Sequence, residues 1–232
     1  MNAIPSSGEL ARKGDFIEIK FTGYVEGKPF DSNITEDLKH LNEKATPEKT
    51  IVIIGEQMVV RGLDKAFENK ELNKEYRIKL TPQEGFGQRR REFVKTIPLK
   101  VFSQQRVHPR PGVTLLLDNQ LARIITVSGA RVITDFNNPL AGKELEYKFT
   151  IMRIVTDKKE KAEAACKLIF QFVPEIEITE NTITIKGPEI LEQFINHNQA
   201  KFKELLGTEV LFQEAKTPAN SEAAQLSVQQ SL

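Results

Sequence analysis

The chain of 232 residues is poor in cysteine, has no tryptophan, and carries no excess of either charge. Its single cysteine excludes an intramolecular disulfide framework, which needs cysteines in pairs. Thirty-three Lys and Arg residues balance 32 Asp and Glu residues, and this argues against nucleic acid as the main partner. No apolar run approaches the roughly 20 residues that span a bilayer, and no basic and apolar leader opens the chain. We therefore expect a cytoplasmic protein that binds neither nucleic acid nor membrane.

Metal-ligand spacing is also missing from the sequence. His40, His108 and His197 lie far apart, whereas structural zinc sites need Cys and His at short, fixed intervals. Helical spacing places Cys166 on an apolar face, which favours buried packing over a reactive thiol. No glycine-rich phosphate loop or nucleophile elbow is present. The sequence therefore predicts no metal and no cofactor.

Strand signals dominate the first half of the chain after a lead, residues 1–13, that is expected to be flexible. The block GDFIEIKFTGYVEGKPFDS at 14–32 alternates apolar and polar residues around a turn near Gly27. The polar stretch 33–50 offers a capping-box helix start at Thr35. A short helix is expected in GEQMVVRGLDKAF, and another alternating strand in KEYRIKLT.

Residues 88–137 form a stretch that is too long for an ordinary loop. It contains four short segments rich in β-branched residues and separated by Pro, Gly or Asp-Asn turns. They are EFVKTIPLKVF, GVTLLLD, LARIITVS and ARVITDF. Four such strands predict a small β domain of their own.

The composition changes at Asp157. The sequence from there to residue 215 predicts a helix, a two-stranded hairpin, a second helix and a final strand. The second helix is expected to bury a stripe made of Ile190, Phe194, Phe202 and Leu205. The tail, residues 216–232, is rich in Ala, Ser and Gln without periodicity, so we expect it to be disordered.

Four segments, FTGYVEGKPFD, VVRGLD, GFG and PLAGKELEY, occur in one order and together resemble the core of FKBP-type peptidyl-prolyl cis-trans isomerases. The interrupting stretch resembles the insert-in-flap chaperone domain of SlyD-type members and of long archaeal forms. The resemblance implies an α+β fold: an antiparallel half-barrel sheet wrapped on a short helix, a small β insert domain, and a small α+β C-terminal domain. The expected domains are the core at 1–87 and 138–156, the insert at 88–137, the C-terminal domain at 157–215, and the tail at 216–232.

The resemblance also implies an apolar pocket for proline with one charged member. Its expected lining is Tyr24, Phe30, Asp31, Val59, Val60, Leu63, Phe86 and Tyr147. The Val60 N–H would hold a substrate carbonyl, and the Tyr24 hydroxyl would orient Asp31. Leu63 stands where many members have Trp, and Phe86 where many have Tyr. These departures imply a slightly deeper pocket and one hydroxyl fewer.

Such a pocket suits isomerisation because the reaction needs no nucleophile. Rotation about an X-Pro bond breaks amide resonance against a barrier of about 18–20 kcal/mol. A catalyst lowers this barrier by binding the twisted amide better than either planar form. The twisted amide has less charge separation, so a desolvated apolar pocket favours it. Each lining residue, taken singly, is also typical of an ordinary core or turn position.

The insert is expected to capture unfolded chains through apolar strand edges. The candidate residues are Phe93, Val94, Ile97, Val101 and Phe102; the alternative is that they fill the small core of the insert. The expected partners are unfolded or proline-containing polypeptides, and a second copy of the chain bound through the C-terminal domain. An alternative function is a non-catalytic peptide-binding holdase or assembly chaperone, which the departures at Leu63 and Phe86 keep open.

Overall fold

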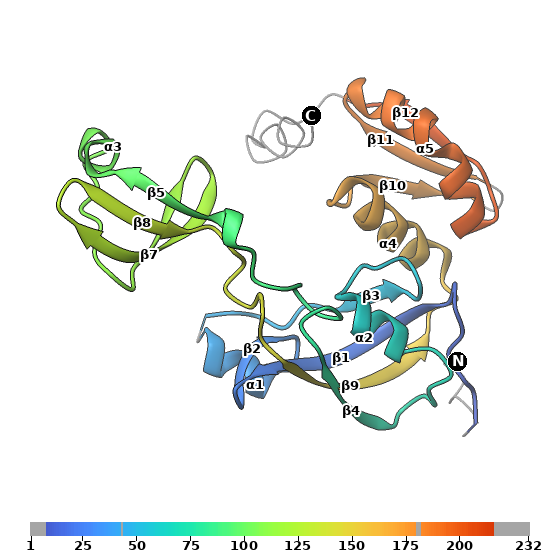
Figure 1. Ribbon diagram of the computed structural model, residues 1–232. Coiled ribbons are helices and arrows are strands. Elements are labelled where there is room, and N and C mark those ends of the chain that lie inside the picture. Colours follow the sequence, from blue (N-terminus) through green and yellow to red (C-terminus); the bar gives the residue numbers. More distant parts are fainter. Residues whose placement is uncertain (1–7, 43, 180–181, 216–232) are drawn as a thin grey trace.

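The computed structural model describes residues 8–42, 44–179 and 182–215, which form three separate sheets with short helices (Figure 1). The first sheet is antiparallel, has the order β2-β1-β9-β4, and carries β3 on the end of β1. Its strands are β1 (Phe16–Val25), β2 (Lys28–Ser32), β3 (Thr50–Ile53), β4 (Glu75–Leu80) and β9 (Leu145–Ile154). Two helices accompany it, α1 (Thr35–Leu41) and α2 (Arg61–Ala66). The expected α+β fold, with an antiparallel sheet around a short helix, is confirmed.

The main core lies between this sheet and α2. The strand β1 turns Ile17, Ile19 and Phe21 to one face, where they are at most 7% exposed. Leu63 and Phe67 come from α2 and its C-terminal end to cover that face, and both are at most 1% exposed. Alternation along the strand and the i, i+4 spacing on the helix bring the two apolar surfaces together.

Two local expectations for this part are wrong. Residues 8–13 are no flexible lead, because the Ala11 N–H donates to the Lys70 carbonyl at 2.9 Å and Ala11 is fully buried. The helix α1 has Ile34 as its N-cap and no side-chain capping bond. Thr35 already lies inside the helix, so its hydroxyl is not at the position where a capping side chain bonds the first N–H groups.

The insert is a four-stranded sheet with the order β5-β8-β7-β6. Its elements are η1 (Arg91–Phe93), β5 (Val94–Pro98), α3 (Leu99–Gln104), β6 (Thr114–Leu117), β7 (Gln120–Ser128) and β8 (Arg131–Asp135). The four expected strands are present, but the first is shorter than expected, since residues 99–104 are helical. Pro98 ends β5, and α3 then places Phe102 in the centre of the insert's own core.

The two segments that link the insert to the main sheet bind each other. The Gly142 N–H donates to the Gly87 carbonyl at 2.8 Å. The Asn137 side chain accepts from the Arg90 N–H at 2.8 Å and donates to the Arg90 carbonyl at 3.0 Å. Figure 1 shows the insert as a lobe at the end of this double connection.

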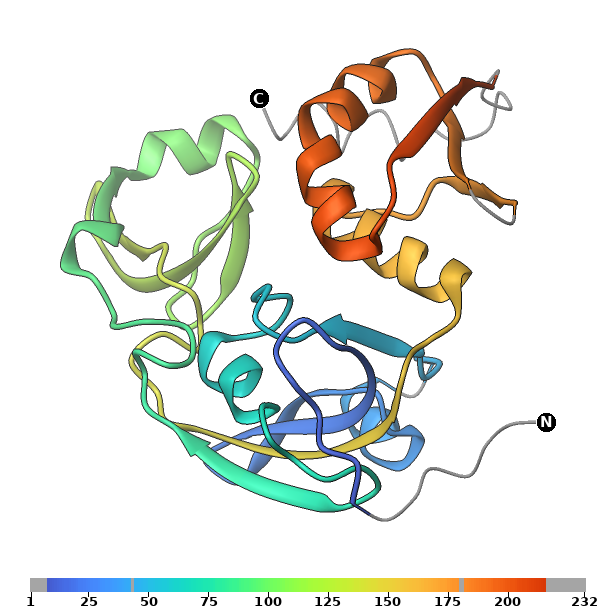
Figure 2. The same cartoon turned by 90° about the vertical axis from the view of Figure 1, so that its right-hand side faces the viewer.

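The C-terminal part has its own three-stranded sheet, in which β11 pairs antiparallel with β10 and parallel with β12. Its elements are α4 (Lys158–Phe170), β10 (Glu175–Ile178), β11 (Ile183–Gly187), α5 (Ile190–Leu206) and β12 (Val210–Glu214). Figure 2 shows this lobe and the insert as separate bodies on the same side of the main sheet. The hairpin turn at 180–181 and the predicted disordered tail lie outside the described residues.

The buried stripe of α5 differs in part from the expected one. Phe202 is fully buried, but Ile190 is 46% exposed, and Leu191 and Ile195 are buried in its place. The helix begins at Ile190, so this residue lies at the end where no further turn covers it. Cys166 is 1% exposed, as expected, and burial raises the pKa of its thiol to about 12.

Candidate functional site

Three aromatic rings meet at the open end of the main core. Phe30 of β2 packs edge-on against Tyr147 of β9, with ring centroids 5.8 Å apart. It packs in the same manner against Phe86, at 6.1 Å, from the segment after β4. The first two rings come from strands on either side of β1, so the sheet itself brings distant parts of the sequence together. Such rings offer a large apolar surface with defined geometry.

Gly23 leaves room for this cluster. A Cβ atom at residue 23 would lie 2.8 Å from the Phe30 ring and 2.9 Å from the Tyr147 ring. Any larger residue would therefore displace both rings. Gly23 pairs with Tyr147 across β1 and β9, so its Cα faces the same side of the sheet as the aromatic cluster.

The helix α2 and the two residues before it supply further apolar side chains to the same core. Leu63 is buried in the core, and Val59 and Val60 pack against it while remaining partly exposed. The Val60 carbonyl accepts from the N–H groups of Leu63 and Asp64 at 2.9 and 3.0 Å. Among the hydrogen bonds of the described residues, none is donated by the Val60 N–H. This donor is therefore suited to a peptide carbonyl.

A buried carboxylate shapes the turn before Val59. Asp64 is 4% exposed and accepts from the Gly55 N–H at 3.1 Å. Desolvation raises the pKa of Asp64, although the hydrogen bonds from Gly55 and Gln57 oppose this shift. The Gly62 N–H donates to the Glu84 carbonyl at 2.8 Å, which connects α2 to the segment that carries Phe86. Both sides of the pocket are thus tied to one short helix.

Asp31 is the charged group beside the rings. Its neighbours desolvate the carboxyl and raise its pKa, while a hydrogen bond from the Ser32 N–H lowers it. Burial raises the pKa of the Tyr147 hydroxyl, and the Asp31 charge raises it further. The two groups therefore share one electrostatic environment at the rim of the pocket.

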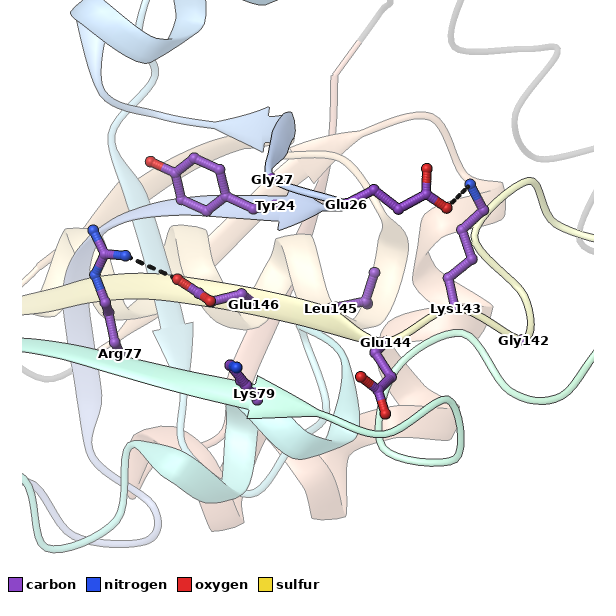
Figure 3. A pocket seen from close by; sticks show the side chains of 10 residues that line it. All are labelled: Tyr24, Glu26, Gly27, Arg77, Lys79, Gly142, Lys143, Glu144, Leu145 and Glu146. Atoms are coloured by element: carbon purple, nitrogen blue, oxygen red, sulfur yellow. Dashed lines mark hydrogen bonds and ion pairs between the residues drawn. The ribbon is translucent and has the colours of Figure 1, made fainter.

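The expected place of Tyr24 in this pocket is wrong. Tyr24 pairs with Glu146 across β1 and β9, one position beyond the pair formed by Gly23 and Tyr147. Successive side chains of a strand point to opposite faces. Figure 3 shows Tyr24 on the outer face of the sheet with Arg77 and Glu146, which form an ion pair at 2.9 Å. No hydrogen bond joins Tyr24 to Asp31 among the described residues.

Phe21 is the residue that the sequence reasoning missed. It is 7% exposed, its ring centroid lies 6.4 Å from that of Tyr147, and it lines a cavity together with Asp31 and Val59. The signal was available in the alternation of β1, since Phe21 and Gly23 are two positions apart and must share a face.

The insert candidates fall into two groups. Phe102 is fully buried, and Ile97 packs against the same core, so the expectation that Phe102 contacts unfolded chains is wrong. Val94 is half-buried. Phe93 and Val101 are 38% and 37% exposed and remain accessible.

A more exposed apolar surface lies on the other side of the insert sheet. We call it the open face. It consists of Leu116 (63% exposed), Leu121 (60%), Ile125 (40%) and Ile133 (38%). Leu116 and Leu121 are direct partners across β6 and β7. The helix α3 covers the opposite face, where Phe102 is buried, so alternation leaves these residues without a cover.

A groove of about 460 Å³ continues the open face toward the linking segments. Leu121 and Ile125 line it together with Arg89, Asp135 and Asn137. Arg89 and Asp135 form an ion pair, and the Asn137 amide also donates to Asp135. The groove thus combines apolar and polar lining residues, which suits an extended peptide.

Neither a metal-binding group nor a membrane-spanning helix is found in the part of the chain that the structure describes. Within residues 8–42, 44–179 and 182–215, no three His, Cys, Asp or Glu side chains gather closely enough to hold a metal ion. No helix in the same part of the chain is long and apolar enough to cross a membrane.

Comparison with known proteins agrees with the arrangement of the sheets. A family model described as FKBP-type peptidyl-prolyl cis-trans isomerase matches residues 7–102, and a model described as FKBP26, IF domain, matches residues 95–140. The chain is 33% identical over 146 residues to a short-type peptidyl-prolyl cis-trans isomerase of Methanocaldococcus jannaschii, covering 61% of this chain and 91% of the relative.

Two bacterial relatives extend the comparison. The chain is 28% identical over 122 residues to FKBP-type peptidyl-prolyl cis-trans isomerase SlyD of Haemophilus influenzae, covering 51% of this chain and 64% of the relative. It is 27% identical over 117 residues to SlyD of Helicobacter pylori, covering 48% and 62%.

Proposed function

Because the chain belongs to the FKBP-type peptidyl-prolyl cis-trans isomerase family, we propose that it isomerises X-Pro bonds in the pocket formed by Phe30, Phe86 and Tyr147. The rest of the proposed pocket consists of Phe21, Asp31, Val59, Val60 and Leu63. The observation that carries this assignment is the edge-to-face ring cluster beside the single carboxylate of Asp31. The domain boundaries given above are part of the same proposal.

The pocket would act by binding the twisted amide more tightly than the planar forms. The proline ring lies among the aromatic rings and Leu63, away from water. The Val60 N–H donates to a carbonyl of the substrate backbone and so fixes its position while the amide rotates. Removal of water favours the less polar, twisted amide over the planar ground state. No covalent step is required.

We further propose that the open face of the insert holds unfolded or proline-containing chains. Its apolar residues lie on strands, and the edge strand β6 has free main-chain groups for pairing with an extended peptide. Phe93 and Val101 are exposed elsewhere on the insert, Val101 on the helix α3, and are separate candidate contacts for such chains. A chain held there is close to the pocket in the same molecule, which raises its effective concentration at the pocket. The cytoplasm is the proposed location.

The C-terminal sheet is the proposed site of pairing between two copies of the chain. Leu211 and Ile190 are 51% and 46% exposed on this lobe, and Val173 is 47% exposed. Exposed apolar side chains on one lobe are typical of an interaction surface. Sedimentation of wild type and of Leu211→Ser tests this: a dimer that the substitution weakens supports it, and a wild-type monomer contradicts it.

The pocket is tested by the cis/trans exchange rate of a short X-Pro peptide, measured by NMR at equal concentrations of enzyme. Wild type is expected to accelerate exchange, and Phe30→Ala to lose about tenfold or more, since burial of a Phe side chain contributes about 1.5–3 kcal/mol. Asp31→Ala is also expected to reduce the rate. Tyr24→Ala is the matched control, because this tyrosine lies on the outer face and its loss is expected to leave the rate unchanged.

Two results would contradict the assignment. If Phe30→Ala and Asp31→Ala both turned over the peptide at the wild-type rate, the pocket would lie elsewhere. If folded wild type did not accelerate exchange but still suppressed aggregation of an unfolded protein, the holdase alternative would replace the isomerase.

A further inference from the structure

The C-terminal domain is packed against the isomerase core next to the pocket. An apolar cluster with members from both parts joins them. Its buried members are Phe16, Ile53, Val155 and Ala164. Met58 packs against this cluster as well as against the main core, and it immediately precedes Val59 of the pocket. The segment that carries Val59 is therefore supported from both domains.

Ion pairs fix this contact on two sides. Both carboxylate oxygens of Glu160, at the start of α4, accept from the Nη2 atom of Arg153, at 2.9 and 2.8 Å, and Glu160 also pairs with Lys49. Lys201 of α5 pairs with Glu56 at 2.7 Å, just before Met58. With polar contacts around an apolar centre, the C-terminal domain is docked on the core rather than hanging from a linker.

A cavity of about 410 Å³ lies beside the pocket at this junction. It shares Phe21, Asp31 and Val59 with the pocket, and Glu48 also lines it. Lys167 of α4 is the one lining residue that the C-terminal domain supplies and the one cation among the lining residues. A substrate that occupies the pocket therefore extends, on this side, toward a residue of another domain.

The helix α4 positions Lys167 by its contacts on the same side. Ala164 and Leu168, three residues before and one after, pack in the cluster between the domains. Lys167 is exposed, and within the described residues no carboxylate lies at ion-pair distance from its amine. The carboxylates that line the same cavity are those of Asp31 and Glu48, and Glu163 lies one turn away on the same helix as Lys167.

We propose that Lys167 is a specificity-determining residue that admits an acidic residue beside the X-Pro bond of the substrate. Without it, the cavity would present only the carboxylates of Asp31 and Glu48 and would repel an acidic side chain. With it, the amine offsets that repulsion and pairs with the substrate. This inference rests on the proposed position of the pocket.

The test uses three X-Pro peptides that differ only in the residues flanking the X-Pro pair, which are Glu, Gln or Lys. Exchange is measured by NMR with the full-length wild type, Lys167→Glu and Lys167→Gln. The ratio compared is kcat/KM for the Glu peptide divided by kcat/KM for the Lys peptide, and Lys167→Glu is expected to lower it by about tenfold. An exposed charge pair has a modest energy, but the loss for the Glu peptide and the gain for the Lys peptide both lower the ratio. The change is expected in KM, with the Gln peptide unaffected.

Lys159→Glu is the matched control, because it makes the same charge change on an exposed position of α4 that does not line the cavity. It is expected to leave the ratio unchanged. The role of Lys167 is overturned if Lys167→Glu leaves the ratio unaltered, or if it lowers kcat/KM equally for all three peptides. In either case, turnover of the Gln peptide by wild type still supports the pocket. Failure of wild type to turn over the Gln peptide overturns the pocket, and the inference with it.

Discussion

The main sheet and the insert sheet both have strands with apolar side chains, but they differ in whether a helix covers those side chains. In the main sheet, Ile17 and Ile19 are at most 1% exposed because α2 and its flanking residues cover their face. In the insert, α3 covers one face, and Leu116 and Leu121 on the other are at least 60% exposed. Apolar side chains of the same kind therefore stabilise the fold in the main sheet and are available to a partner in the insert. The covering helix, rather than strand composition, makes this difference.

The largest expected effect separates the two kinds of apolar residue by stability. Phe67→Ala removes a fully buried ring that packs edge-on against Phe149 at 5.0 Å. We expect it to lower the free energy of unfolding by about 3–5 kcal/mol. Leu121→Ala, on the open face, is expected to change it by at most about 0.5 kcal/mol. Urea unfolding followed by circular dichroism measures both, and equal losses would mean that the open face is covered.

The next effect separates them by function. Leu116→Ser with Leu121→Ser is expected to weaken binding of an unfolded, permanently reduced protein about tenfold, since roughly 1.4 kcal/mol of apolar contact is lost. Exchange of a short X-Pro peptide is expected to stay at the wild-type rate. The control pair, Leu41→Ser with Val173→Ser, removes exposed apolar residues outside the insert. Equal weakening by both pairs would contradict a specific role of the open face.

The smallest effect concerns two carboxylates whose pKa values shift in opposite directions. Burial by itself would raise the pKa of Asp135, at the end of β8 in the insert, but hydrogen bonds from Asn137 and the charge of Arg89 lower it overall. A lowered pKa contributes stability above the ordinary value of 3.8, and this contribution is lost as pH falls through the folded pKa. The free energy of unfolding of wild type is therefore expected to exceed that of Asp135→Asn by about 1 kcal/mol near pH 6. This difference is expected to disappear as the pH falls below 3.8.

Asp64 in the core gives the contrasting result. Because its pKa is raised in the folded state, ionisation of Asp64 lowers the free energy of unfolding. The free energy of unfolding of wild type is therefore expected to rise relative to that of Asp64→Asn as the pH falls toward 3.8. The urea midpoints of methyl resonances from the insert and from the core, followed by NMR between pH 2.5 and 7, report the two regions separately. Parallel pH slopes for the two variants would contradict both assignments.

Several parts of the site were readable from the sequence because they depend on local patterns. The strand around Phe21 and the short helix around Leu63 follow from alternation and helical spacing, and the return strand with Tyr147 follows from the family motif. The placement of Tyr24 failed because it lies an odd number of positions from Phe21 and Gly23 in the same strand, so its side chain takes the opposite face. The prediction that Phe102 contacts unfolded chains failed because Pro98 ends the strand. Phe102 then lies in a helix and packs beneath the sheet.

The sequence by itself determined the order of the strands along the chain, the family, and the residue types that line the pocket, since these follow from local spacing and from motifs. Only the tertiary structure decided which face each side chain takes, that Leu116 and Leu121 stay uncovered, and that Lys167 of α4 lies at the cavity beside Asp31. These properties depend on contacts between segments far apart in the chain, where docking of whole domains, rather than local propensity, sets the neighbours of each residue.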